Sequence, residues 1–152
     1  MHNTPTREFV LVEIGREFGR DVVQSLAAAG IPAQVVRTRS DMERLADQPG
    51  RSVVAVLPIG DVRSSEPFLG VRAARPERLV VDLFLGRERF GLPIYQEDVI
   101  EIGRSLMLDY DFSLSRALDY ARRRQAFEKT ESFFRQLIAR DERLKDYRAA
   151  LA

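Results

Sequence analysis

The first half of the chain alternates short apolar runs with amphipathic stretches. Three apolar runs are continuous enough to predict strands buried on both faces, at residues 9–14, 33–36 and 52–57. Between them, residues 17–29 and 40–46 repeat apolar side chains at the spacing of a helix. The order strand, helix, strand, helix, strand predicts a parallel sheet with right-handed crossovers.

Capping residues mark the ends of the two predicted helices. Gly30 and Pro32 follow the first helix in the usual order of C-terminal stop signals. Ser40 is a suitable N-cap for the second helix, and Glu43 three residues later completes the pattern of a capping box.

The middle of the chain is interrupted more often. Residues 58–78 contain three Pro and two Gly, which predicts a long loop or one poorly formed helix. Leu79–Leu85 has the sequence LVVDLFL and predicts a fourth strand, and Phe90–Leu92 is a candidate for a short fifth strand. A helix is predicted over residues 96–108.

The C-terminal region lacks residues that break helices. All nine Gly and seven Pro lie within the first 103 residues, and the last 49 residues contain neither. Because Pro costs about 3 and Gly about 1 kcal/mol inside a helix, this region is predicted to be mostly helical. Asp111 or Ser113 can cap a helix that begins near Leu114. We therefore predict a three-layer α/β body of four or five mainly parallel strands over residues 1–110, and a C-terminal helical arm over residues 111–152.

The predicted arm carries a wide apolar stripe. Phe127, Phe134, Leu137 and Leu144 recur near heptad spacing, and Tyr147 widens the stripe. A stripe of this width suits a helix packed on a domain or in a bundle better than a strict two-stranded coiled coil. Three interpretations follow: the arm covers its own body, it forms a homodimer, or it docks on another protein.

Composition limits the chemistry that the chain can perform. It has no Cys and a single His, His2, which excludes thiolate nucleophiles, serine–histidine catalysis and multi-histidine metal sites built by one chain. No cofactor or metal ion is predicted. The longest apolar runs fall far short of the roughly 20 residues of a membrane span, so we expect a cytoplasmic protein without a membrane segment.

Charge is modest overall but unevenly distributed. The net charge is +1 at pH 7, which disfavours a nucleic-acid-binding role. Residues 1–111 hold 14 Arg and 17 acidic residues, for −3, whereas residues 112–152 hold 10 basic and 6 acidic residues, for +4. The densest basic stretch, Arg122–Arg124, is diluted by Asp119 and Glu128 and is typical of a solvated helix face.

Ligands of an open parallel sheet gather beyond the carboxyl ends of its strands. The residues predicted there fall in four segments: Glu13–Arg16, Arg37–Arg39, Pro58–Asp61 and Leu85–Arg89. Convergence of Glu13, Asp61 and Asp82 at this edge would create an oxygen-ligand magnesium site of the kind used in phosphoryl transfer or hydrolysis. The alternative is that these carboxylates are solvated or ion-paired.

The turn after the first predicted strand offers a second kind of site. Gly15, Arg16 and Arg20 lie where that strand ends and the first helix opens. Backbone N–H groups at a helix N-terminus can hold an anion, and the two arginines could assist. The alternative is an ordinary strand–helix turn, because the glycine spacing fits neither of the common phosphate-binding motifs.

The organisation through Leu108 resembles the receiver domain of response regulators, and more loosely the flavodoxin-like fold. The resemblance is carried by FVLVEIGREFGRDVVQSLAAAGIPAQVV at residues 9–36 and by GRERFGLPIYQEDVIEIGRSL at residues 86–106. Receivers begin with a strand ending in acidic residues, and they end with a short strand and a Pro before the last helix. The resemblance implies an α/β fold of this type.

The residues that receivers use for phosphorylation are incomplete in this chain. Glu13 stands where receivers carry an acidic pair, Leu57 and Pro58 occupy the place of the phosphoacceptor, and Leu92 precedes Pro93 where receivers have Lys. A rival alignment makes Asp82 the acceptor. The resemblance thus implies a pseudo-receiver that signals by contacts. Our leading hypothesis is a non-catalytic regulatory or protein-interaction module acting through its C-terminal helices; the alternative is a magnesium-dependent enzyme.

Overall fold

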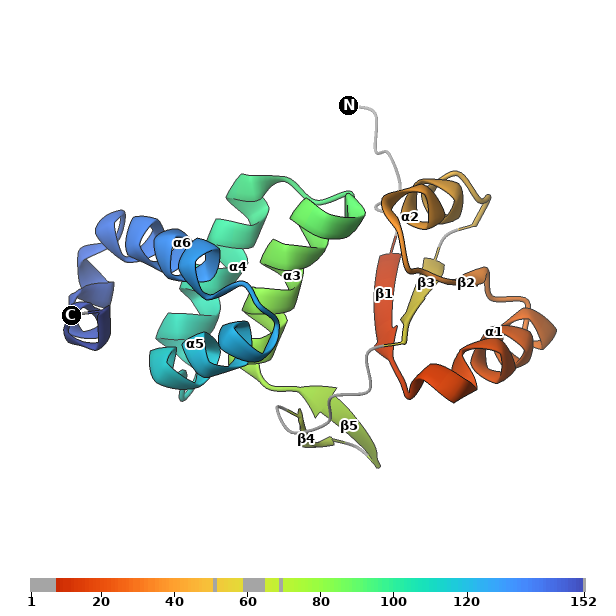
Figure 1. Ribbon diagram of the computed structural model, residues 1–152, viewed down its shortest axis with the longest axis horizontal. Coiled ribbons are helices and arrows are strands. Elements are labelled where there is room, and N and C mark those ends of the chain that lie inside the picture. The colour runs from red at the N-terminus through yellow and green to blue at the C-terminus, as the bar shows by residue number, and fades with distance from the viewer. Residues whose placement is uncertain (1–7, 51, 59–64, 69, 152) are drawn as a thin grey trace. The chain divides into compact units, whose positions relative to one another are not determined.

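The computed structural model describes residues 8–50, 52–58, 65–68 and 70–151. The chain divides into two compact units (Figure 1). We call residues 1–62 together with 89–93 the α/β unit, and residues 63–88 together with 94–152 the helical unit. The predicted boundary at residue 110 does not coincide with this division.

The α/β unit is built on a parallel sheet with the strand order β1-β3-β2. Its strands are β1 (Glu8–Glu13), β2 (Ala33–Val35) and β3 (Ser52–Leu57), and its helices are η1 (Arg16–Phe18, a 3-10 helix), α1 (Gly19–Ala28) and α2 (Arg39–Ala46). The three predicted strands and the two predicted helices are confirmed, but the first helix begins as the 3-10 turn η1, which the sequence did not predict. The flavodoxin-like order 2-1-3-4-5 places the first strand between the second and the third, whereas here β3 lies between β1 and β2.

Burial follows the position of each strand. In β3, Val53 to Leu57 are all buried, because this strand has a partner on both sides. In β1, which pairs only with β3 among the described strands, Val10 is 44% exposed. The continuous apolar sequence of the central strand is therefore explained by its place in the sheet.

Helix α2 begins with a capping box, but not the one predicted. The N-cap is Thr38, whose Oγ1 accepts a hydrogen bond from Asp41 N at 3.2 Å, while Asp41 Oδ2 accepts from Thr38 N at 2.9 Å. Ser40 and Glu43 therefore lie inside the helix. These backbone hydrogen bonds, led by one from Arg37 N, lower the pKa of Asp41 to about 2. At the other predicted stop, Gly30 has a φ of +74°, as expected of a helix C-terminus.

The helical unit contains a β-hairpin followed by helices. Its elements are β4 (Ser65–Phe68), β5 (Val71–Ala74), α3 (Pro76–Phe90), α4 (Gln96–Asp109), α5 (Leu114–Arg123), α6 (Phe127–Ala139) and the 3-10 helix η2 (Glu142–Leu151). The predicted helix over 96–108 and the Ser113 cap of α5 are confirmed. None of the helices in the described part of the chain is long and apolar enough to cross a membrane.

The predicted fourth strand is wrong, because Leu79–Leu85 lies inside helix α3. Pro76 occupies the first helical position, where its missing N–H costs nothing. Val80, Val81 and Leu85 are buried, whereas Leu79 on another face is 37% exposed. The candidate fifth strand at Phe90–Leu92 is also wrong, since Phe90 ends α3. Within the described residues, the parallel sheet therefore has three strands rather than four or five.

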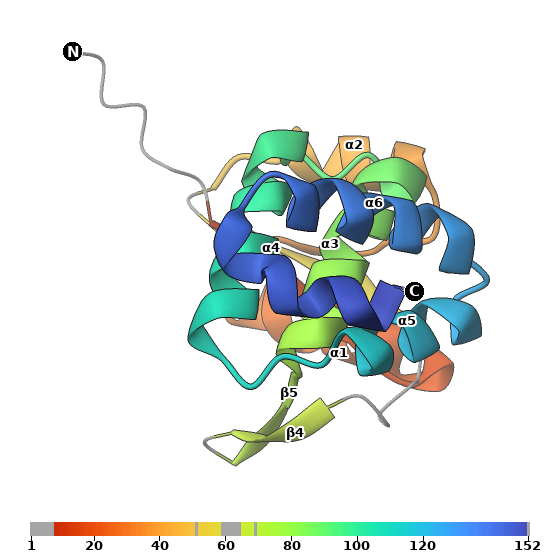
Figure 2. The same ribbon diagram turned by 90° about the vertical axis from the view of Figure 1, so that its left-hand side faces the viewer.

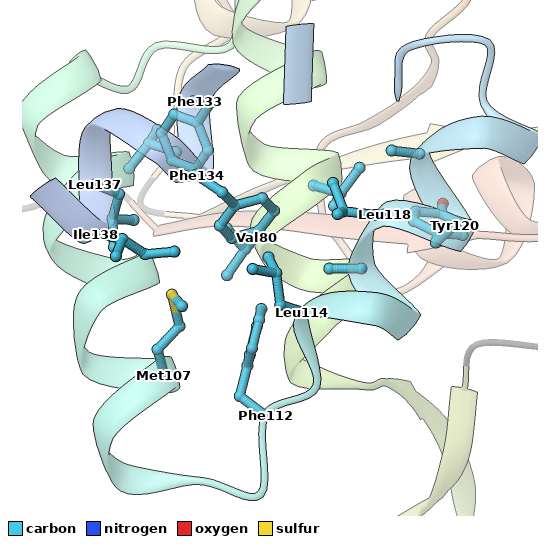
Figure 3. Packing of buried hydrophobic residues seen from close by; sticks show 14 of the residues in the cluster. Val80, Met107, Phe112, Leu114, Leu118, Tyr120, Phe133, Phe134, Leu137 and Ile138 are labelled. Atoms are coloured by element: carbon cyan, nitrogen blue, oxygen red, sulfur yellow. The ribbon is translucent and has the colours of Figure 1, made fainter. Parts of the chain in front are cut away.

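The C-terminal helices share a core with α3 and α4 (Figure 2). Side chains from all of them meet in one cluster, in which Val80 of α3 lies among Leu114, Leu118, Phe133 and Phe134 (Figure 3). The C-terminal helical region is interrupted at Gln125, which has a φ of +54°. The break lets α6 turn back towards α3 and α4.

Helices α4 and α6 approach closely at a glycine. A Cβ atom added to Gly103 would lie 2.8 Å from Leu137 Cδ1 and 3.4 Å from Val80 Cγ1. Gly103 therefore serves close helix packing rather than ending a helix, and it marks the point where α4 meets both α3 and α6.

Candidate anion-binding site

A crevice of about 470 Å³ opens in the α/β unit, at the carboxyl ends of its parallel strands. It is lined by Arg16, Val36, Arg37, Leu57, Pro58 and Phe90. Arg16 follows β1, Val36 and Arg37 follow β2, and Leu57 and Pro58 come from the end of β3. This is the edge at which open parallel sheets bind ligands.

Backbone hydrogen bonds beyond the strand ends fix the floor of the crevice. Ile14 N donates to Leu57 O at 3.1 Å, and Val36 N donates to Val56 O at 2.9 Å. These bonds extend the sheet by one residue past β1 and β2. The side chains of Val36 and Leu57 are buried, so the floor is apolar and held in place.

Two arginines provide the charge of the crevice. Arg16 and Arg37 are exposed, and neither side chain forms an ion pair or hydrogen bond with a described residue. The nearest acid in sequence to Arg37 is Asp41, which already accepts hydrogen bonds from two backbone N–H groups and from Arg44. The guanidinium groups are therefore available to an anion.

Phe90 completes the lining from a distant part of the sequence. It is the last residue of α3 and belongs to the segment 89–93, which packs with the α/β unit. The chain turns at Gly91, with a φ of +64°, and a Cβ there would lie 2.7 Å from Arg39 Nε. The close approach of the turn to Arg39 places Phe90 beside the strand ends.

The structure separates the residues of the predicted anion site. Arg16 lines the crevice, whereas Gly15 and Arg20 do not. Arg37 lies at the predicted strand edge. Phe90 was missed, because no local pattern reports a contact between residues that are more than thirty positions apart.

The three carboxylates proposed for magnesium do not form a common site in the described residues. Glu13 ends β1 in the α/β unit, Asp82 lies on α3 in the helical unit, and Asp61 is outside the described residues. Asp82 is already bound within its own unit, since Tyr120 Oη donates to its two carboxylate oxygens at 2.8 and 3.0 Å and Arg78 Nε donates at 3.2 Å. Across the described part of the chain, no three His, Cys, Asp or Glu residues are grouped as metal ligands.

Burial dominates the titration of the Asp82 cluster. Removal from water raises the pKa of Asp82, and the hydrogen bond from Tyr120 and the charges of Arg124 and Arg78 only partly oppose it. Burial and the Asp82 carboxylate together raise the pKa of Tyr120. Arg78 also lies over the Tyr120 ring, 5.5 Å from its centroid. The cluster ties α3 to α5.

A second buried carboxylate joins the same two helices. Glu77, 3% exposed, accepts hydrogen bonds from Ser113 N at 2.9 Å and from Arg116 Nε at 2.9 Å and Nη2 at 2.6 Å. It thereby fixes the start of α5 against the first turn of α3. Both carboxylates have the partners expected of structural groups.

The predicted interaction stripe faces the core of its own unit. Phe134, Leu137 and Leu144 are buried there, and Phe127 and Tyr147 are partly buried against the same cluster. Tyr147 Oη donates to Met107 O at 2.9 Å, and Arg122 lies 4.3 Å from the centroid of the Phe127 ring. The first of the three interpretations, packing on the chain's own structure, describes these residues.

Comparison with known proteins adds no relative from which a function could be inferred. No protein-family model, no curated protein and no solved structure matches the chain.

Proposed function

We propose that this protein is a non-catalytic regulatory module that acts by binding, and that its α/β unit recognises a small anionic ligand. The observation that carries this proposal is the pair Arg16 and Arg37, without ion-pair partners among the described residues, over an apolar floor at the strand ends. Guanidinium groups bind phosphate and carboxylate through charge-assisted, two-pronged hydrogen bonds.

The composition of the crevice favours binding over catalysis. The six lining residues that the structure describes are two Arg, one Val, one Leu, one Pro and one Phe. Arginine stays protonated at any working pH, and the other four side chains cannot transfer a proton. The described lining residues therefore supply neither a nucleophile nor a general acid or base.

The position of Phe90 supports a regulatory role. A ligand in the crevice would touch the last residue of α3, and the same helix carries Val80, Val81 and Leu85 of the helical core. Binding at the α/β unit thus acts on one end of a helix whose residues up to Glu88 belong to the helical unit. The receiver-like resemblance lends this proposal no weight, because the strand order differs from the flavodoxin-like one.

Titration of the full-length chain with inorganic phosphate at constant ionic strength tests the proposal. We expect saturable amide shifts, observed by NMR, at the strand-end residues around Val36 and Leu57. Arg16→Gln and Arg37→Gln should each weaken binding about tenfold or more, since each removes one charge-assisted pair. Arg20→Gln is the matched control, because Arg20 is exposed on α1 and lies outside the crevice.

Two outcomes would count against this proposal. Equal weakening by all three substitutions would indicate a diffuse charge effect instead of a site. Shifts near Glu13 that require Mg²⁺ would favour the magnesium-dependent enzyme.

Partner binding through the helical unit is the second part of the proposal, either to a second copy or to another protein. Because the predicted stripe is buried, we assign this role to exposed side chains. Tyr95 and Tyr110, at the two ends of α4, are 81% and 61% exposed, and tyrosine is enriched at protein interfaces. Light scattering of the wild type and of a Tyr95→Ser, Tyr110→Ser variant tests it. A monomeric mass for both the wild type and the variant would contradict the proposed homodimer.

A further inference from the structure

The crevice is larger than an inorganic anion requires. Its volume of about 470 Å³ lies in the range of small-molecule sites, roughly 300–1,000 Å³. A water molecule takes up about 30 Å³ of liquid, and a phosphate ion is only a few times larger. Space therefore remains beside the anionic group for a further part of the ligand.

The apolar lining of the crevice determines the chemical character of that further part of the ligand. Val36, Leu57, Pro58 and Phe90 are apolar, and no described lining side chain can accept a hydrogen bond. Hydroxyl or amine groups of a ligand would find no side-chain acceptor there, whereas a flat apolar ring would bury surface against the Phe90 ring. The two arginines therefore favour an anionic group at one end of the ligand, and the apolar lining favours an apolar group at its other end.

The charge of the site matches a dianion. Two guanidinium groups face the crevice, and no carboxylate is among its described lining residues. A phosphate monoester carries a charge of about −1.5 to −2 at pH 7, which two arginines neutralise, whereas a carboxylate carries −1. With no carboxylate in the described lining, the residues present do not fit a protein-held magnesium ion.

We infer that the ligand of this crevice is a phosphate monoester on a flat apolar ring, bound without a metal ion, with the phosphate at Arg16 and Arg37 and the ring at Phe90. The inference rests on the proposed function and narrows it to one class of ligand.

The test compares probes on the unaltered full-length protein by calorimetry or NMR titration. We expect phenyl phosphate to bind about tenfold or more tightly than inorganic phosphate, because burial of the ring adds hydrophobic stabilisation. Phenyl phosphate should also exceed benzoate, which has the ring but a single charge. Addition of EDTA or Mg²⁺ should leave these affinities unchanged.

Substitution at Phe90 separates the two ends of the site. Phe90→Ser should lower the affinity for phenyl phosphate to that for inorganic phosphate and leave inorganic phosphate binding unchanged. Arg37→Gln should weaken both. Circular dichroism of each variant shows whether it folds, and the probe comparison on the wild type decides the question if Phe90→Ser does not.

The outcomes distinguish this inference from the proposed function. Equal affinity for phenyl phosphate and inorganic phosphate, tighter binding of benzoate, or a requirement for Mg²⁺ would overturn the inference while the anion site stands. Failure of every anion to bind would overturn both.

Discussion

The two units differ in the pairing of their charged side chains. In the helical unit, Glu77 and Asp82 of α3 accept hydrogen bonds from Arg116 and Tyr120 of α5, and the buried Arg78 donates to Asp82 within α3. In the α/β unit, Arg16 and Arg37 lie at the edge of a crevice and have no partner among the described residues. Paired buried charges fix one helix against another, whereas unpaired charges beside an apolar floor are suited to a ligand. We therefore propose that the helical unit contributes mainly stability and that the α/β unit binds the ligand.

The units also differ in how completely they bury their apolar side chains. The helical unit has one continuous cluster that runs from α3 to η2. Figure 3 shows the part of it that α3, α4, α5 and α6 contribute. The α/β unit buries its central strand but leaves Val10 of β1 nearly half exposed. Substitutions in the two units should therefore differ in cost.

The largest expected effect comes from the core of the helical unit. Phe134 is fully buried and packs against Phe112 and Phe133. Phe134→Ala should lower the free energy of unfolding by about 3–5 kcal/mol, through lost burial and the cavity left behind. Val10→Ala on the exposed edge strand is the comparison and should cost well under half as much. Urea denaturation followed by circular dichroism measures both, and similar costs would remove the distinction between the units.

The second effect concerns the hydrogen bonds of Asp82. Asp82→Asn replaces one of the two carboxyl oxygens that accept hydrogen bonds from Arg78 and Tyr120 with an amide NH2 group, and we expect it to cost about 1–3 kcal/mol. Because burial raises the pKa of Asp82 above its ordinary value of 3.8, its contribution to stability is full below pH 3.8. That contribution is lost progressively as the pH rises through the raised pKa.

The cost of Asp82→Asn should therefore be larger near pH 4 than at pH 7. Denaturation of the wild type and the variant at both values tests this sign. A cost that grows with pH would mean that the arginines outweigh burial and lower the pKa of Asp82 in the folded protein.

The third effect lies in the α/β unit, at the start of α2. Thr38→Ala removes the side chain that caps the helix and should cost about 1–2 kcal/mol. Ser40→Ala, the matched control, should cost less than a few tenths, because Ser40 is already inside the helix. Both costs come from thermal or urea unfolding. The reverse order would restore Ser40 as the cap and shift the helix start by two residues.

Local patterns predicted the α/β unit well and the helical unit less well. The strands at 9–14, 33–36 and 52–57 could be predicted because their continuous apolar runs differ from the helical spacing of apolar residues in the segments between them. LVVDLFL was misread because a dense apolar run fits a buried strand and a buried helix equally. Its helical state depends on the core that α4, α5 and α6 supply, which no window of the sequence contains.

The site shows the same limit. Arg16 and Arg37 could be placed at the strand ends by counting along the chain, since both follow predicted strands. Phe90 could not, because the turn at Gly91 brings it there through packing against Arg39. The stripe from Phe127 to Tyr147 was correctly identified as apolar, but a pattern cannot show whether such a face meets its own unit or a partner.

The smallest expected effect is an increase in stability. It concerns a buried polar group of the helical unit that lacks a hydrogen-bond partner among the described residues. Thr130 on α6 is fully buried, and its Oγ1 has no hydrogen-bond partner among the described residues. Thr130→Val replaces that hydroxyl with a methyl group of similar shape, so it should raise the free energy of unfolding by about 0.5–1 kcal/mol. Thr130→Ala is the control, since it removes the hydroxyl but also leaves a cavity, and it should not stabilise. Loss of stability in the valine variant would mean that the hydroxyl has a hydrogen-bond partner in solution.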